Sequence, residues 1–291
     1  GDNYGGMRLF KSVSDTPKTS DSLRWAMHIW NTRALISAGE SPDSALAYAL
    51  KAQALAEGID AEARAVSLTM MSELAYLQDE HETALAHIAA ARQALSTVTD
   101  KSEQTLSWTW LVEARVLSSL GKVPESIKAA EKARSSRPSW PAPIHFIAKQ
   151  ALRTDQVREA ERVLQPLLNK QPITAETERT RRLLEHIRSG AVPTSVAYEY
   201  LTQQQAPPSH RAISALRDLC KNYPAIVLFR ESLGWKLLRA GDYDRAAEVF
   251  ATLSDRTDLS NEETSSVLLA LGMLAAVDSR HAMIGAKLKA A

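Results

Sequence analysis

Two histidines near residue 80 lie closest to a metal-binding motif in this sequence. The stretch "DEHETALAH" contains His81-Glu82, which looks like the start of a helical zinc-protease pattern. That pattern needs a second histidine four residues after the first. His87 instead comes six residues later, about 600° round a helix, so the two imidazoles cannot share a face. We therefore predict no zinc site here.

Other residues that could take part in catalysis lie at positions where they have a structural role. The motifs G-x-S-x-G, P-loop and G-x-G-x-x-G do not occur. Carboxylates in stretches such as "NEET" and "TAETER" fall at helix starts or on polar faces, where they favour the positive end of the helix dipole. The single cysteine, Cys220, excludes an intramolecular disulfide and a cysteine-rich zinc site. We expect a protein that is not an enzyme, with no catalytic residue, no cofactor and no metal.

The charge balance excludes classes of partner. The formal net charge is +1, from 35 basic and 34 acidic residues, which gives no overall attraction to nucleic acid or to anionic membranes. The sequence has no run of 18 apolar residues, so we expect no membrane insertion by this segment. In the arginine-rich stretch "ERTRRLLEHIR", i,i+4 spacing pairs Glu178 with Arg182 and Arg181 with Glu185. This predicts a solvated face of ion pairs rather than a nucleic-acid patch.

The elements that must position any site are helices. Aromatic residues make up only 6% of the chain, alanine-rich runs recur, and apolar residues follow one another at spacings of three and four. Short breaks, often marked by glycine or proline, separate the segments. The predicted helices are 21–38, 43–57, 61–78, 81–96, 103–120, 123–135, 141–153, 156–169, 174–189, 194–205, 209–222, 226–240, 242–255 and 260–277.

The helices repeat in pairs with a period of 34 residues. Pro138 and Pro172 are 34 residues apart, and so are Ala212 and Ala246. From Pro172 to Pro224 is 52 residues, one period plus an additional 18-residue helix. Because the loops are short, consecutive helices must lie antiparallel as a string of hairpins.

The stretch "LGWKLLRAGDYDRAAEVF" resembles the tetratricopeptide repeat. Leu233-Gly234 and Leu237 occupy its first helix, and Ala246 and Phe250 its second. The stretch departs from the repeat pattern at the aromatic and proline positions, which hold Arg230 and Asp258. Two further copies contain Trp110, Ala114, Leu117, Ser126, Ala130 and Pro138, and then Ile144, Ala148, Ala151, Ala160, Leu164 and Pro172.

The resemblance covers residues 21–278 and implies an all-α fold, an α-solenoid in which antiparallel helix hairpins stack into a right-handed superhelix. We expect residues 1–20 to be a flexible tail or linker, and 279–291 to be a C-terminal tail or partial helix. Tyr200 stands where the repeat needs a small residue, so we expect an extra or irregular helix around 174–206.

Solenoids of this family bind peptides or proteins on a concave face lined by the first helix of each pair. The register predicts a partly basic groove with tryptophan anchors, suited to a protein or peptide ligand with acidic groups. Packing of Trp108 and Trp235 between hairpins is the alternative reading. The predicted groove residues are Asn31, Tyr76, Trp108, Arg115, His145, Lys149, Arg153, Trp235 and Arg239.

We therefore expect a bacterial adaptor or assembly factor that acts as a protein-binding scaffold. Two alternatives stay open: a regulatory sensor for a small ligand or signalling peptide, and a self-association module that forms a homo-oligomer. The sequence begins at Gly1, so we expect that a signal, anchor or tag preceded it. Cytoplasmic and extracytoplasmic or periplasmic locations both remain open.

Overall fold

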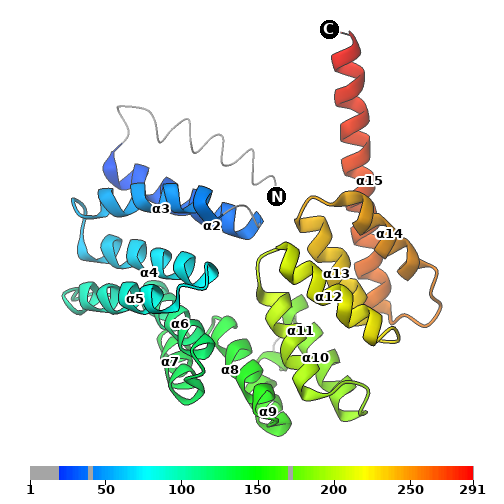
Figure 1. Cartoon of the computed structure of the whole chain (residues 1–291), viewed down its shortest axis with the longest axis horizontal. Coiled ribbons are helices and arrows are strands. Elements are labelled where there is room, and N and C mark those ends of the chain that lie inside the picture. The colour runs from blue at the N-terminus through cyan, green and yellow to red at the C-terminus, as the bar shows by residue number, and fades with distance from the viewer. Residues whose placement is uncertain (1–19, 39–41, 170–172, 291) are drawn as a thin grey trace. The chain divides into compact units, whose positions relative to one another are not determined.

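Helices make up the described part of the chain (Figure 1). The computed structural model describes residues 20–38, 42–169 and 173–290, and the side chains of the last helix up to residue 277. Within these residues there are 14 helices, which confirms the predicted all-α class. The helices are α2 (Asp21–Ala38), α3 (Pro42–Ala56), α4 (Ala61–Leu77), α5 (His81–Ser96), α6 (Glu103–Ser119), α7 (Val123–Ser136), α8 (Ala142–Arg153), α9 (Val157–Leu168), α10 (Ala175–Arg188), α11 (Thr194–Gln205), α12 (His210–Asn222), α13 (Val227–Arg239), α14 (Tyr243–Ser254) and α15 (Asn261–Ala290).

The chain forms two compact units, Gly1–Glu178 and Arg179–Ala291. Their boundary falls within the 174–206 segment, inside α10. Nearly all of the predicted tail at 1–20 lies outside the described residues. At the other end, the backbone beyond residue 278 continues α15 as helix.

Helices that follow one another in sequence pack against each other, as a helical repeat requires. In the first unit α2 packs with α3, α4 with α5, α6 with α7 and α8 with α9. In the second unit α13 packs with α14, and α14 with α15. The sequential pairing predicted from the short loops is confirmed.

One turn recurs at the ends of five helices. After α4, α6, α8, α10 and α13 a residue adopts a left-handed conformation, with φ between 60° and 77°. The N–H of the next residue then donates to the carbonyl five positions back, at 2.8–3.0 Å, which satisfies a helix-terminal acceptor. Glycine suits this conformation because it lacks Cβ, and aspartate tolerates it. The five residues are Asp79, Gly121, Asp155, Gly190 and Gly241.

Small residues at one position of the second helix in each pair let neighbouring helices approach closely. Each of these residues exposes at most 1% of its surface. Hydroxyl groups on first helices bond across the contact: Ser72 Oγ donates to the Ala84 carbonyl at 2.9 Å. The buried small residues are Ala45, Ala84, Ser126, Ala160, Ala212 and Ala246.

Gly234 also allows α13 and α14 to approach closely. A Cβ built on Gly234 would lie 2.7 Å from Cζ of Phe250, closer than two carbons can come. The fully buried Phe250 ring of α14 therefore occupies the space that a side chain on α13 would take. Glycine inside a helix costs about 1 kcal/mol relative to alanine, and the buried phenylalanine offsets that cost.

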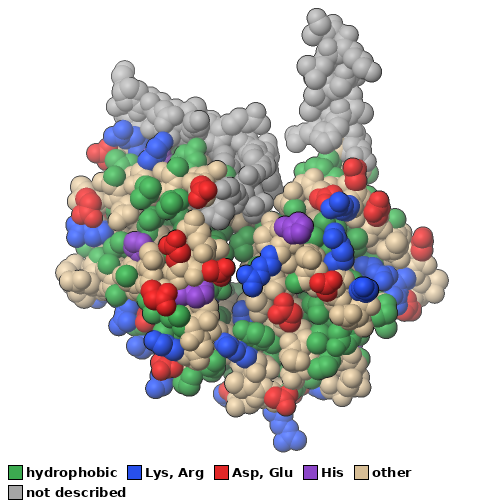
Figure 2. All heavy atoms as spheres, viewed as in Figure 1, with side chains coloured by type: hydrophobic (Ala, Val, Ile, Leu, Met, Phe, Trp, Pro, Cys, Tyr) green, Lys and Arg blue, Asp and Glu red, His purple; other side chains and the backbone are tan. Residues whose placement is uncertain are grey.

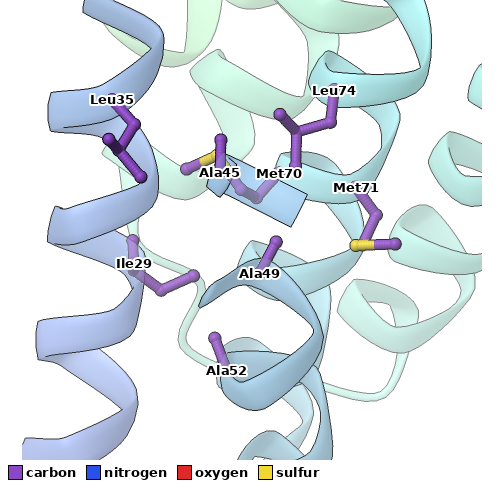
Figure 3. Close-up of a cluster of buried hydrophobic side chains, with 8 residues drawn as sticks. All are labelled: Ile29, Leu35, Ala45, Ala49, Ala52, Met70, Met71 and Leu74. Carbon is purple, nitrogen blue, oxygen red and sulfur yellow. The ribbon is translucent and has the colours of Figure 1, made fainter. Parts of the chain in front are cut away.

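The core at the start of the first unit is built from three helices (Figure 3). Alanines of α3 face larger side chains from α2 and α4, so that α3 lies close to both neighbours. Trp108 packs against this cluster from α6 and also against a second cluster around Ile88. The cluster residues are Ile29, Leu35, Ala45, Ala49, Ala52, Met70, Met71 and Leu74.

Charged side chains of both signs are intermixed on the face shown in Figure 2, in keeping with the net charge of +1.

The start of α15 carries a capping box. Ser260 N–H donates to Glu263 Oε2 at 2.8 Å, and Glu263 N–H donates to Ser260 Oγ at 3.2 Å. This pair satisfies two donors that a helix start leaves open.

Candidate partner-binding site

A pocket of about 320 Å³ in the first unit brings two of the predicted groove residues together. Trp108 and Arg115 both lie on α6, seven residues apart and therefore on one face. The helices α2 and α4 add one charged side chain each, and the end of α7 with the loop after it closes the rim. We call this the Trp108 pocket; its lining residues are Arg33, Glu73, Gln104, Trp108, Arg115, Arg137 and Trp140.

Two arginines of the pocket lie against tryptophan rings. The guanidinium carbon of Arg33 is 4.3 Å from the Trp108 ring centroid, and that of Arg137 is 6.0 Å from the Trp140 centroid. Among the described residues neither arginine forms an ion pair, although the Glu73 carboxylate, which pairs with Arg115, is close enough to Arg33 to interact with its charge. A guanidinium that lies over an aromatic ring keeps its N–H groups available for a planar acceptor such as a carboxylate.

The third arginine of the pocket is paired. Arg115 Nη1 lies 2.9 Å from Glu73 Oε1, which joins α6 to α4. The lining therefore holds three arginines and one glutamate, an excess of two positive charges. Because pocket walls shield the site from part of the solvent, this excess attracts anions more strongly than the same charges on an open surface.

Lys149 and Arg153, two further predicted residues, lie on α8. Burial and then the nearby cations Arg115 and Arg153 lower the pKa of Lys149 to about 7, against Glu176, which raises it. Arg153 is exposed, and its guanidinium donates to the carbonyl and hydroxyl of Ser118 at 2.9 and 3.2 Å. Arg153 thus extends the positive charge beside Arg115 and also holds the end of α6, whereas Lys149 is only partly protonated at neutral pH.

Three predicted residues of the first unit are packed into the protein. Asn31 exposes only 1% of its surface and its amide has no hydrogen-bond partner among the described residues, whereas Arg33, two positions on, reaches the pocket. His145 is buried and its Nε2 lies 3.1 Å from the Thr177 hydroxyl; burial lowers its pKa. Tyr76 packs on the cluster around Ile88. Asn31 and His145 therefore cannot form a surface groove.

The other two predicted residues, Trp235 and Arg239, belong to the second unit. Trp235 is half-buried: its indole N–H donates to the Ser266 hydroxyl at 3.0 Å, and its ring meets Phe250 edge-on with centroids 5.6 Å apart. Trp235 thus packs between helices, the alternative considered for it above. Arg239 is exposed in the last turn of α13.

The second unit contains a buried ionic cluster around Glu231, which exposes 2% of its surface. Arg182 bridges the carboxylates of Glu231 and Glu263 at 2.8 and 2.9 Å, and Ser266 donates to Glu231 at 2.7 Å. The predicted solvated face of α10 is therefore wrong for Arg182, because this side chain turns toward α13 and α15. The predicted pair of Arg181 and Glu185 is present on the surface.

The described residues hold few groups poised for chemistry. Within residues 20–38, 42–169 and 173–277, no three His, Cys, Asp or Glu side chains gather to hold a metal ion. Burial raises the pKa of the Cys220 thiol to about 11, so the reactive thiolate is scarce at neutral pH. Of the helices that the structure describes, none has both the length and the apolar character needed to cross a bilayer.

Five pocket residues were not predicted from sequence: Arg33, Glu73, Gln104, Arg137 and Trp140. Arg33 and Glu73 lie on first helices of their pairs, so a signal was present: each is a charged residue close to a predicted groove position. Arg137 and Trp140 lie beyond the last residue of α7, where helical periodicity does not predict the orientation of a side chain. The sequence matches no protein-family model and no curated protein.

Proposed function

We propose that this protein is a tetratricopeptide-like scaffold that binds an acidic segment of a partner protein at the Trp108 pocket. The pocket itself is the observation that carries the proposal. It is built by α2, α4 and α6, the first helices of three successive pairs, which is where solenoids of this family present their ligand surface.

The recurring turn and the buried small residues support the family resemblance. The turn and the small residues recur at equivalent positions of several successive pairs, as the repeat pattern requires. α4 packs directly on α6, and the hydroxyl oxygens of Thr69 and Thr109 lie 3.0 Å apart between them. In the proposed solenoid each unit is a stack of such pairs, with its ligand face formed by the first helices.

Recognition would combine charge with an apolar wall. A partner carboxylate would accept hydrogen bonds from the unpaired Arg33 and Arg137, while an adjacent apolar side chain would pack on Trp108 and Trp140. Hydrogen bonds between ionised partners are stronger than neutral ones, and tryptophan and arginine are enriched among the residues that dominate binding energy. The pocket is held rigidly, since Trp108 is packed against two core clusters.

The proposal is tested by peptide titration followed by fluorescence anisotropy. The probe is a terminally blocked, labelled peptide with two adjacent glutamates beside a leucine; its control replaces both glutamates with glutamine. The acidic peptide should bind saturably, with affinity that falls as salt rises, and the glutamine peptide should bind much more weakly. Equal binding of both peptides would contradict recognition of carboxylates.

Charge-reversed variants locate the binding. Arg33→Glu and Arg137→Glu should each reduce affinity for the acidic peptide by roughly tenfold or more. Arg134→Glu is the matched control, because Arg134 lies on α7 three residues before Arg137, is paired with Glu131 and does not line the pocket. If Arg134→Glu reduces affinity as much as Arg137→Glu, binding reflects overall charge and the pocket assignment fails.

A small anionic ligand is the second candidate, favoured by the pocket's volume. At about 320 Å³ the pocket is at the lower end of the size range of small-molecule sites. In this case the protein would be a sensor that changes a distant interaction when the ligand binds. Small-angle scattering separates the two: a sensor becomes more compact on ligand addition, whereas a rigid scaffold keeps its radius of gyration.

A further inference from the structure

The contact between α13 and α14 provides a template for helix docking in the second unit. Gly234 of α13 leaves room for the Phe250 ring, as described above, and Trp235 beside it meets that ring edge-on. In α14, the small residue Ala246 precedes Phe250 by four positions, so both face α13 as fully buried residues. The glycine of α13 thus leaves a space, and an aromatic side chain of α14 occupies that space.

Helix α15 shares a Leu-Gly pair and part of its burial pattern with α13. Leu271-Gly272 follows Leu233-Gly234 by 38 residues. With this offset, three residues that α13 buries correspond to residues that α15 buries, as α15 packs on α14 and α13. The matching buried pairs are Phe229 with Val267, Ser232 with Ala270, and Lys236 with Leu274.

The two helices differ on the face that holds the glycine. A Cβ built on Gly272 would have nothing within 4 Å, in contrast to the crowded Gly234. Around it, Leu268 and Leu269 each expose 61% of their surface and Met273 exposes 43%. Half of the exposed large apolar side chains of the described chain therefore gather on two turns of α15. Patches of this kind mark interaction surfaces.

We infer that the face formed by Leu268, Leu269, Gly272 and Met273 binds an amphipathic helix of a partner protein, which places an aromatic side chain over Gly272. We call it the Gly272 face. The partner helix would have the character of α14, with a small residue four positions before the aromatic one. The α13–α14 contact supplies the geometry at the glycine, because Phe250 of α14 covers Gly234, the counterpart of Gly272 on α13.

The chemistry of the face defines its partner further. The four side chains or backbone positions of the Gly272 face carry no charge, so the partner helix must present an apolar stripe, with its charges at the margins. Because Gly272 has no Cβ, the two helix axes can approach closely. A flat aromatic ring fits this narrow space better than a branched aliphatic side chain does. This surface is separate from the Trp108 pocket and belongs to the second unit.

The test uses a peptide with the sequence of α14, the helix that covers Gly234, as its probe. The probe is a labelled peptide of residues 242–255 in which Asp244→Lys is joined to Glu248 by a lactam. Both bridged positions are exposed in α14, so the link holds the helix without covering its apolar face. Binding to the full chain is measured by fluorescence anisotropy, together with the same peptide carrying Phe250→Ala. Leu269→Lys is the protein variant, and Leu50→Lys, at another exposed helical leucine, is its matched control.

The expected result is saturable binding that Phe250→Ala in the peptide and Leu269→Lys in the protein each weaken by about tenfold or more, while Leu50→Lys has no effect. Circular dichroism of both protein variants verifies that they fold. Failure of the bridged peptide to bind, equal binding of the Phe250→Ala peptide, or equal loss with Leu50→Lys would overturn the inference. Self-association of the unmodified chain that Leu269→Lys abolishes would also overturn it, since a second copy would then cover the face.

Discussion

Arg115 Nη1 of α6 and Glu73 Oε1 of α4 lie 2.9 Å apart, although the two residues are 42 positions apart in sequence. This ion pair fixes the Arg115 guanidinium at the wall of the Trp108 pocket and neutralises one of its three arginines. Glu73 therefore has two opposite effects on an acidic ligand: it positions one cation and repels the ligand's carboxylates.

Replacing Glu73 with glutamine separates these effects. Glu73→Gln keeps a hydrogen-bond acceptor for Arg115 but removes the negative charge, so affinity for the acidic peptide should rise roughly fivefold. The free energy of unfolding should fall by less than about 1 kcal/mol, because the pair is partly exposed. Glu113→Gln, which breaks the pair with Arg92 at 3.1 Å outside the pocket lining, is the control and should leave affinity unchanged. Weaker binding by Glu73→Gln would show that Glu73 contributes to the ligand contact itself.

The buried carboxylate of Glu231 should matter far more for stability than exposed carboxylates do. Glu231→Ala removes the partner of Arg182 and the acceptor of the Ser266 hydroxyl, and we expect a loss of about 3–5 kcal/mol. Glu185→Ala is the control: it breaks the exposed pair with Arg181, the residue before Arg182, and should cost less than about 1 kcal/mol. Urea unfolding followed by circular dichroism measures both. Similar losses in the two variants would contradict the difference in burial.

Lys236 should make stability depend on pH. Burial and then the nearby cations Arg239 and Arg179 lower its pKa from 10.5 to about 8. Its ammonium donates to the carbonyls of Gln204 and Ala206 at 3.0 and 2.6 Å. Between pH 8 and 10.5 the unfolded chain binds more protons than the folded chain, so the free energy of unfolding rises with pH.

We expect this group to add about 2 kcal/mol to the free energy of unfolding between pH 7.5 and 9.5. Lys236→Met should lose that rise, and Lys221→Met, at an exposed lysine of α12, should keep it. Urea titrations at several pH values measure the slope. An unchanged slope in Lys236→Met would mean that another group causes the dependence.

Alanine at the two equivalent glycines should have opposite effects. Gly234→Ala places a Cβ against the Phe250 ring and should destabilise the protein by about 1–3 kcal/mol, in spite of the better helix propensity of alanine. Gly272→Ala meets open space and should stabilise α15 by up to about 1 kcal/mol. Thermal melting of both variants checks the contrast. If Gly234→Ala melts above the parent, Phe250 has room to move and close approach is not the reason for the glycine.

The sequence was sufficient for the helices because each helix carries its own signal. Apolar residues at three and four spacings mark the faces, and glycines or prolines mark the breaks; Gly241, for example, occupies the left-handed turn that follows α13. Trp108 and Arg115, which line the same pocket, could be assigned to one face because α6 belongs to a copy with clear repeat positions on both sides.

The rest of the site depends on information that periodicity does not carry. Asn31 was placed on the groove and Arg33 was not, yet a shift of two residues rotates a helical position by about 200°. The loop near residue 40 blurs the repeat register of that first pair, so the sequence did not show which face of α2 is turned toward the groove. Trp140 lies in a loop, and Arg182 finds its carboxylates 49 and 81 residues away, which no local pattern indicates.

That long reach has a consequence for how the protein acquires its structure. Most contacts in stacked helix pairs are local and form early, but the Glu231 cluster joins α10 to α13 and α15 and needs a long loop to close first. During synthesis α10 leaves the ribosome well before its partner carboxylates exist. Arg182 can therefore pair with Glu231 only after α13 is made, and the cluster is complete only after α15 follows.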